Sequence, residues 1–293
     1  MSIEEVARRI ENDLKCQLDG CGIMFRMFSR VKTPFSLAHK MSLKGDKYRS
    51  GNAKIQDVIG LRIVVYFPDD VEIAELLVNK NRVLDRSIDD PDSCTFKPQR
   101  LNITCRIPEQ YTEDFRAGLP EEFAPYIDES YEVQIRTIFS EGWHEVEHDL
   151  RYKCKEDWVG YENYSRTLNG VIATLETAEW TMTSLFKHMA YDNYCNGNYS
   201  AMLRNHLRIR IKGNSLSPKL SEFLRTHTDV AFAVYNMDRM VFLFSILLHK
   251  NRIPLDYDTA LFIINRMEVQ NMDLMALEDE EMKAKISRFL KNE

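Results

Sequence analysis

Residues 59–67 of the chain read IGLRIVVYF, a run of β-branched, aliphatic and aromatic residues with a single charge. Such a run is typical of a strand that is buried inside a sheet. Pro68 ends the run, and the acidic residues Asp69 and Asp70 then predict the start of a helix that continues through Val78. A strand followed at once by a helix is typical of an α/β fold, so this stretch sets the fold class.

The rest of the first half continues this alternation. The spacing of apolar residues predicts a helix over 2–18, a helix that presents Lys40 after the basic stretch 26–40, strands over 99–106 and 130–136, and a helix over 138–153. The acidic segment 107–127 is predicted to be a loop. Helices and strands in this order form a mixed sheet with helices packed on it.

The second half has a different pattern. Residues 161–194 carry one long helical periodicity, and residues 215–293 contain at least three further helices with no clear strand. We therefore predict two domains, an α/β domain at 1–157 and a mostly helical domain at 158–293. The second domain is expected to be regulatory or to bind a partner.

Composition restricts the class of protein. The 293 residues are 44% hydrophobic, which is enough for a buried core, and the net charge of −6 excludes a nucleic-acid binder that is basic throughout. The most apolar stretch, 240–248, is too short to span a membrane. The six cysteines are scattered and form no CxxC pair, so we expect a cytoplasmic protein with reduced thiols and no membrane partner.

One motif suggests zinc. Residues 144–148 read HEVEH, which fits the H-E-x-x-H pattern of zinc hydrolases. Such an enzyme needs a third ligand, and the downstream candidates Glu176 and His188 are weak support in so helical a chain. A helix whose polar face carries two histidines is the favoured interpretation.

A second set of residues suggests phosphate chemistry. Asp57 precedes the strand at 59–67 and Glu132 lies on the strand at 130–136, so neighbouring strands would bring both carboxylates to one divalent cation. The cations around them are Arg30, Lys32, Lys40, Arg62 and Arg136. Phosphoryl transfer needs mainly positioning and neutralisation of charge, which this set supplies. Taken alone, such charges are also compatible with an ordinary solvated surface.

The order of four separated motifs carries more information. They are SRVKTPFS with Lys40, IQDVIGLR, EVQIRT and W-x-x-x-E-H-x-x-x-Y-K, which begin at residues 29, 55, 132 and 143. Over about residues 20–155 the chain resembles the synthetase domain of the RelA/SpoT family of alarmone synthetases. The fourth motif also accounts for the H-E-x-x-H match.

This resemblance implies an enzyme that transfers the β,γ-pyrophosphate of ATP to a ribose 3′-hydroxyl, usually of GDP or GTP, with Mg²⁺ as cofactor. It implies a nucleotidyltransferase-like mixed sheet flanked by helices, followed here by the helical C-terminal domain. Asp57 and Glu132 resemble the metal-binding and catalytic carboxylates, and Glu132 would activate the acceptor hydroxyl. The residues implied to bind ATP are Arg30, Lys32, Lys40 and Arg62. Those implied to line the acceptor side are Gln134 and His148.

One loop departs from the family pattern. Family members read G-Y-x-S-x-H and stack the tyrosine on the acceptor base, whereas residues 96–102 here read FKPQRLN. By register, Pro98 stands in place of the tyrosine and Asn102 in place of the histidine. Phe96 or Arg100 would then supply the stacking group on the acceptor side.

This departure leaves three functions open. Synthesis of guanosine tetra- or pentaphosphate, (p)ppGpp, is the leading one. The alternatives are a toxin that pyrophosphorylates the 3′ end of tRNA and a catalytically silent nucleotide-binding sensor. The family's hydrolase half is not found in the sequence, so the resemblance is to a small, synthetase-only member.

The second half suggests partners. Residues 207–212 alternate apolar and basic residues, and an extended segment would present three cations to an RNA backbone. The helices after 215 are rich in methionine and aromatic residues, which are expected to form core, or a surface for a second copy of the chain or a protein partner.

Overall fold

The structure is a computed structural model that describes residues 1–291 except 52, 89–100 and 250–252. The chain divides into two compact units. The first comprises Met1–Cys16 and Phe25–Ala178, and the second comprises Gln17–Met24 and Glu179–Glu293. The domain boundary predicted after residue 157 stays a prediction.

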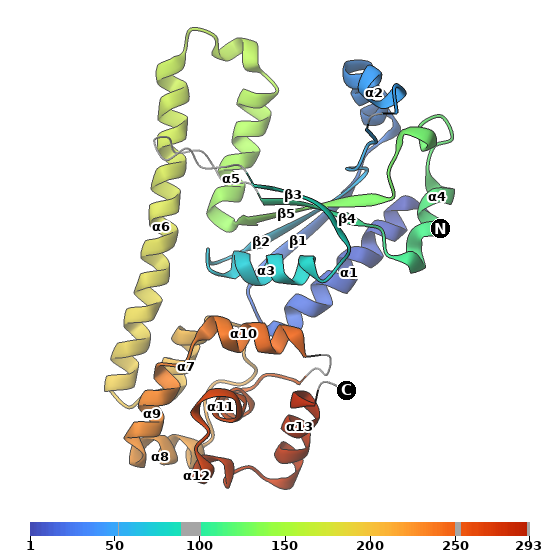
Figure 1. Ribbon diagram of the computed structural model, residues 1–293. Helices are drawn as coiled ribbons and strands as arrows, with labels where there is room; N and C mark the ends of the chain where they lie inside the picture. The colour runs from blue at the N-terminus through green and yellow to red at the C-terminus, as the bar shows by residue number, and fades with distance from the viewer. Residues whose placement is uncertain (52, 89–100, 250–252, 292–293) are drawn as a thin grey trace. The chain divides into compact units, whose positions relative to one another are not determined.

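A five-stranded mixed sheet is the centre of the first unit (Figure 1). Its strands are β1 (Phe25–Val31), β2 (Ile59–Val65), β3 (Val83–Ile88), β4 (Leu101–Arg106) and β5 (Ser130–Thr137). They lie in the order β1-β2-β5-β4-β3. The pair β2 and β5 is parallel, and the other neighbouring pairs are antiparallel. The predicted α/β class with a mixed sheet is confirmed.

Helices connect and cover these strands. They are α1 (Ile3–Cys21), α2 (Pro34–Arg49), α3 (Asp70–Asn79), α4 (Glu109–Gly118), α5 (Ile138–Glu147) and the first part of α6 (Glu162–Cys195). Short 3₁₀ or π-helical turns occur at Ala124–Tyr126, His148–Tyr152 and Lys155–Trp158. Figure 1 shows α1 and α3 together on one side of the sheet.

The two faces of the sheet differ because side chains alternate along each strand. One face is apolar: Ile59, Leu61 and Ile63 of β2 and Tyr131 and Val133 of β5 are each at most 1% exposed. On the other face, Gly60 and Arg62 of β2 and Glu132 and Gln134 of β5 remain partly exposed. The apolar face therefore forms the core, and the polar face is free for a site.

Most of the predicted elements are confirmed, and three segments differ. The basic stretch contains strand β1, the segment 83–88 forms strand β3, and residues 109–118 of the expected loop form helix α4. In β1 every second residue is exposed, and two of these three residues are arginines, so their charges conceal the strand pattern. In α4 only Phe115 is buried, which is too little apolar periodicity to indicate a helix.

The second unit is helical, as predicted. Besides the rest of α6, its helices are α7 (Tyr199–Leu207), α8 (Pro218–Thr226), α9 (Thr228–Tyr235), α10 (Arg239–Leu248), α11 (Tyr257–Ile264), α12 (Met272–Met275) and α13 (Glu280–Leu290), with a π-helical turn at Asn265–Val269. Among the described residues no single helix is long and apolar enough to cross a membrane, and α9 and α10 pass that test only as a pair bent by 74°.

The basic residues at 207–212 do not form the extended row that the sequence suggests. Arg208 ends helix α7 in a left-handed conformation, with φ of 48°, and it is only 4% exposed. Arg210 lies 3.8 Å from Asp19 within the same unit. A strip of three cations for an RNA backbone is therefore not present in this segment.

Candidate functional site

The polar face of the sheet brings together residues that are far apart in the sequence. Strand register places two rows side by side across β1, β2 and β5. The first row is Arg30, Gly60 and Glu132, and the second is Phe28, Arg62 and Gln134. Residues two positions apart on a strand share a face, so both rows lie on one surface. Gly60 has no side chain, and Arg30 lies beside it, with Cγ and Nε 3.6 Å from the place that a Cβ would take.

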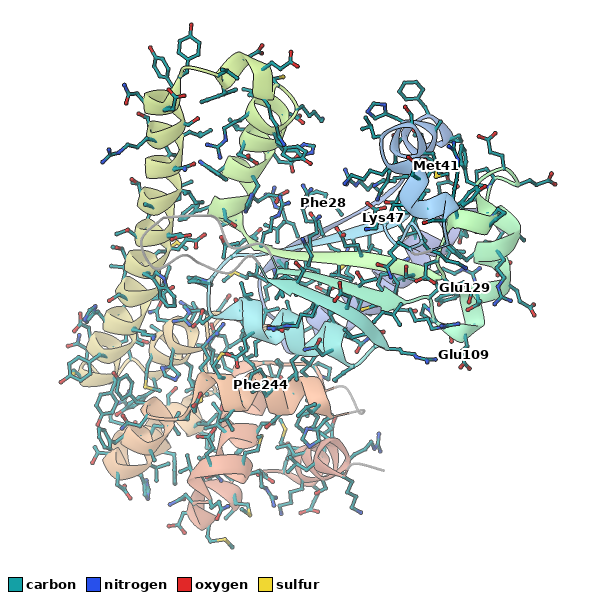
Figure 2. All side chains as sticks on the ribbon, turned by 45° about the horizontal axis from the view of Figure 1, so that its top comes forward. Phe28, Met41, Lys47, Glu109, Glu129 and Phe244 are labelled. Atoms are coloured by element: carbon teal, nitrogen blue, oxygen red, sulfur yellow. The ribbon has the colours of Figure 1, made fainter. Side chains whose placement is uncertain are left out.

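A cavity lies over these two rows. Its empty volume is about 620 Å³, including the part that is open to solvent. The lining residues come from β1, β2, β5, α5 and the approach to β2: Phe28, Ser29, Arg30, Asp57, Gly60, Leu61, Arg62, Glu132, Gln134 and Glu145. Figure 2 shows the side chains on the ribbon, with Phe28 of the cavity wall labelled.

Asp57 is held between two lysines. Lys32 donates from Nζ to Oδ2 at 2.9 Å, and Lys40 donates from Nζ to Oδ1 at 2.8 Å. Burial raises the pKa of Asp57, but the hydrogen bonds and charges of Lys40 and Lys32 outweigh this effect and hold the pKa below its ordinary value. Asp57 is therefore ionised at neutral pH.

Local sequence positions Lys40 for this contact. Helix α2 begins with Pro34, and the side chain of Thr33 caps it by accepting a hydrogen bond from the backbone nitrogen of Ser36 at 3.2 Å. The predicted turn into a helix is thus confirmed. Lys40 follows about two turns into the helix, where its ammonium group meets Asp57.

Hydrogen bonds fix the orientation of the side chains on β5. Gln134 donates from Nε2 to Glu132 Oε1 at 2.7 Å. Arg136 donates from Nη2 to Gln134 Oε1 at 3.0 Å. The amide of Gln134 therefore links the carboxylate of Glu132 to a guanidinium group that is itself only 8% exposed. Oε1 of Glu132 is occupied by this contact.

Glu141 joins the two arginines of neighbouring strands. Arg62 of β2 donates to Oε1 of Glu141 at 2.6 Å, and Arg136 of β5 donates to Oε2 at 2.8 Å. Arg62 also pairs with Glu145, one turn further along α5. Burial lowers the pKa of Arg62, and the hydrogen bonds and charges of Glu141 and Glu145 outweigh it and raise the pKa above its ordinary value.

The bridge through Glu141 is expected to stabilise the fold. Glu141→Gln should lower the free energy of unfolding by about 1–3 kcal/mol, because it weakens hydrogen bonds to two largely buried guanidinium groups. Glu145→Gln is the matched control, since the Glu145 side chain is 53% exposed and an exposed pair contributes about 1 kcal/mol or less. Urea denaturation followed by circular dichroism measures both. Equal losses would mean that the bridge is not structural.

The structure brings five predicted residues to the cavity wall: Arg30, Asp57, Arg62, Glu132 and Gln134. Lys32 and Lys40 reach the site through Asp57. His148 does not line the cavity; it begins a π-helical turn, and its Nδ1 lies 2.9 Å from Asp149. Arg100, Pro98 and Phe96 lie outside the described residues. Asn102 of β4 lies opposite Gln134.

Three residues of the site have a role there that the sequence does not indicate. They are Phe28, Glu141 and Glu145. Phe28 belongs to strand β1, and once that strand is recognised, alternation places it on the same face as Arg30. The two glutamates act through the packing of α5 against the strands, for which the sequence offers no signal.

The residues of the H-E-x-x-H motif lie in different surroundings and make different contacts. His144 is buried in α5 against the ring of Trp143, Glu145 pairs with Arg62, and His148 lies beyond the end of α5. In the part of the chain that the structure describes, no three or more His, Cys, Asp or Glu residues are grouped to hold a metal ion. The H-E-x-x-H residues are therefore not grouped as zinc ligands in this part of the chain.

Comparison with known proteins gives a family match over the same segment. Residues 29–157 match the family described as a region found in RelA / SpoT proteins. No curated protein matches the chain. The match covers residues 29–40 of the basic stretch, the end of β1, the strands β2 to β5 and the helix α5.

Solved structures of low similarity were also found. Small alarmone synthetase 1 from Bacillus subtilis is 21% identical with a TM-score of 0.43, over 61% of this chain and 92% of that chain. A GTP pyrophosphokinase family protein from Streptococcus pneumoniae is 21% identical with a TM-score of 0.44, over 63% and 94%. Small alarmone synthetase 2 from B. subtilis is 20% identical with a TM-score of 0.44, over 62% and 95%.

Proposed function

Residues 29–157 are a RelA/SpoT domain, and on this premise we propose that the protein transfers the β,γ-pyrophosphate of ATP to the ribose 3′-hydroxyl of a guanosine nucleotide. The observation that carries the proposal is the convergence of Glu132, Asp57 and Arg30 on one cavity. Pyrophosphate transfer needs a base for the acceptor and cations for the donor, and the cavity contains both.

The donor side lies over β1 and β2. Arg30 lines the cavity, and the ammonium groups of Lys32 and Lys40 lie at its edge on Asp57. Lysine side chains are long and flexible, so these groups can turn from Asp57 to phosphate oxygens while remaining close to the carboxylate. They would neutralise charge on the migrating pyrophosphate and on the departing AMP.

The acceptor side lies over β5. Glu132 accepts the proton of the 3′-hydroxyl, whose oxygen attacks the β-phosphorus of ATP. The bond from that phosphorus to the oxygen that it shares with the α-phosphorus breaks, and AMP leaves with the bonding electrons. Gln134 holds Oε1 of Glu132, so Oε2 is the oxygen available for the proton.

The residues present fit a magnesium ion. Mg²⁺ takes one or two carboxylates from the protein and completes its coordination with water and phosphate oxygens. Asp57, which is ionised, and Glu132 line the same cavity and are the residues that would hold the ion. When bound, the ion supplies neutralisation of the phosphate charge.

Arg30→Ala should weaken ATP binding roughly 10- to 100-fold, because a hydrogen-bonded contact between a guanidinium and a phosphate is lost. Arg26→Ala is the matched control: Arg26 is an exposed arginine of the same strand that does not line the cavity. Isothermal titration calorimetry with a non-hydrolysable ATP analogue and Mg²⁺ measures both affinities. An unchanged affinity in Arg30→Ala would remove Arg30 from the phosphate site.

A transfer assay tests the function itself. The purified protein is incubated with γ-³²P-ATP and Mg²⁺, and GDP, GTP, ATP and deacylated tRNA are offered in separate reactions. Label on GDP or GTP is the expected result. Label on tRNA alone would mean that the acceptor is tRNA and not a guanosine nucleotide. No label on any acceptor, with ATP still bound, would refute the enzyme and leave a nucleotide-binding sensor.

A further inference from the structure

Phe28 lines the cavity but has no part in the proposed phosphate or proton chemistry. Phe28 is an apolar side chain on the polar face of the sheet, and it is 52% exposed. It lies opposite Arg62 in the strand register and two positions before Arg30 on β1. Phe28 is labelled in Figure 2 beside the sheet.

The fold itself does not require an aromatic ring at this position. The core-facing residues of β1 are on the alternate positions, where Phe25 is 5% exposed. Phe28 points to the opposite face, so its ring adds little to the core. A large apolar surface left partly in water inside a cavity lined with charges is typical of a ligand contact.

We propose that Phe28 is the stacking platform for the nucleobase of the donor nucleotide. This inference rests on the proposed function, because it assumes a nucleotide in the cavity. An aromatic ring stacks on the face of any base, and this contact needs no hydrogen-bonding partner. The ring of Phe28 is the exposed aromatic surface that the described part of the cavity wall offers.

The order of the strands favours the donor over the acceptor. Phe28 and Arg30 lie on the edge strand β1, next to β2, whereas Glu132 and Gln134 lie on β5, beyond β2. Lys32 is four residues after Phe28, which corresponds to about 13 Å of extended chain. That length suits a nucleotide whose phosphates lie at Lys32 and whose base lies at Phe28.

Stacking of this kind makes a specific prediction about base preference. A purine offers a larger face than a pyrimidine, so the platform favours ATP and GTP as ligands over CTP and UTP. Removal of the ring should lower affinity for purine nucleotides and reduce the difference between purines and pyrimidines. The phosphate contacts stay intact, so binding of inorganic triphosphate should not change.

The test uses three variants of the full chain. Phe28→Ala removes the ring, Phe28→Leu keeps much of the apolar volume without an aromatic face, and Phe28→Trp keeps an aromatic face. Phe35→Ala is the control, because Phe35 is 83% exposed on α2 and does not line the cavity. Calorimetry with a non-hydrolysable ATP analogue, the corresponding CTP analogue and inorganic triphosphate gives the affinities, and circular dichroism checks the fold.

The expected result is a roughly tenfold loss of affinity for the ATP analogue in Phe28→Ala and Phe28→Leu, with affinity retained in Phe28→Trp and Phe35→Ala. If Phe28→Ala binds the ATP analogue as well as the wild type, the platform does not exist. If affinity for ATP is kept and the KM for the acceptor rises instead, the donor assignment is wrong. Failure of the wild type to bind any nucleotide would refute the proposed function, and the two failures are thus distinguishable.

Discussion

Glu132→Gln should abolish pyrophosphate transfer, with a fall in kcat of roughly 10²- to 10⁴-fold and with affinity for ATP largely intact. The substitution keeps the shape of the side chain and its place on β5 but removes the oxygen that accepts the proton. Glu132 lines the cavity from β5, across Gly60 from Arg30, so its loss leaves the donor contacts on β1 in place. The effect therefore belongs in kcat and not in the binding of ATP.

Glu109→Gln is the matched control for this experiment. Glu109 is exposed in the first turn of α4, does not line the cavity, and is labelled in Figure 2 well apart from Phe28. Single-turnover measurements with γ-³²P-ATP and GDP separate the chemical step from product release. Turnover of Glu132→Gln at the wild-type rate would eliminate Glu132 as the base.

Asp57→Asn should lower kcat by roughly 10²- to 10³-fold, because the cavity loses one of the two carboxylates that would hold the divalent cation. Lys32 and Lys40 also lose the anion that keeps both ammonium groups together. Released from Asp57, the lysines bind phosphate in less well-defined positions. Affinity for ATP in the absence of Mg²⁺ should therefore persist or even increase while turnover falls.

Measurements of affinity with and without Mg²⁺ test this prediction. Affinity for the ATP analogue is measured with Mg²⁺ and with EDTA for the wild type, Asp57→Asn and the control Asp46→Asn, an exposed aspartate of α2 that does not line the cavity. The wild type and the control should gain affinity from Mg²⁺, and Asp57→Asn should gain less. An equal gain in all three would show that Asp57 does not contribute to cation binding.

Much of the sheet can be predicted from sequence because its central strands are buried. Strand β2 reads almost without polar residues, and five of its seven residues are buried. A parallel pair inside a sheet, covered on its apolar face, produces such runs. The edge strands β1 and β3 carry charged residues among their exposed positions, and there the charges outweigh the weaker apolar pattern.

The residues of the candidate site also fall into two groups, those that can be predicted from the sequence and those that cannot. Arg30, Asp57 and Glu132 can be predicted because they belong to separated motifs whose order the sequence displays. Glu141 and Glu145 cannot, because their role depends on the rotation of α5 about its axis as it packs on β2 and β5. His148 illustrates the converse: it belongs to a motif, but the π-helical turn after α5 places it away from the described cavity wall.

The ion pairs of the cavity have a consequence for which anions it can retain. Three of the cations at the site already have carboxylates as partners: Lys32 and Lys40 share Asp57, and Arg62 is shared by Glu141 and Glu145. A single phosphate ion would have to displace these carboxylates from the cations, and it would leave the carboxylates without a new partner. A nucleotide that arrives with several phosphates and its own magnesium ion replaces the carboxylate on the lysines and supplies a new partner for Asp57 at the same time. On the proposed function, we therefore expect the site to bind inorganic phosphate more weakly than the complete magnesium–nucleotide complex.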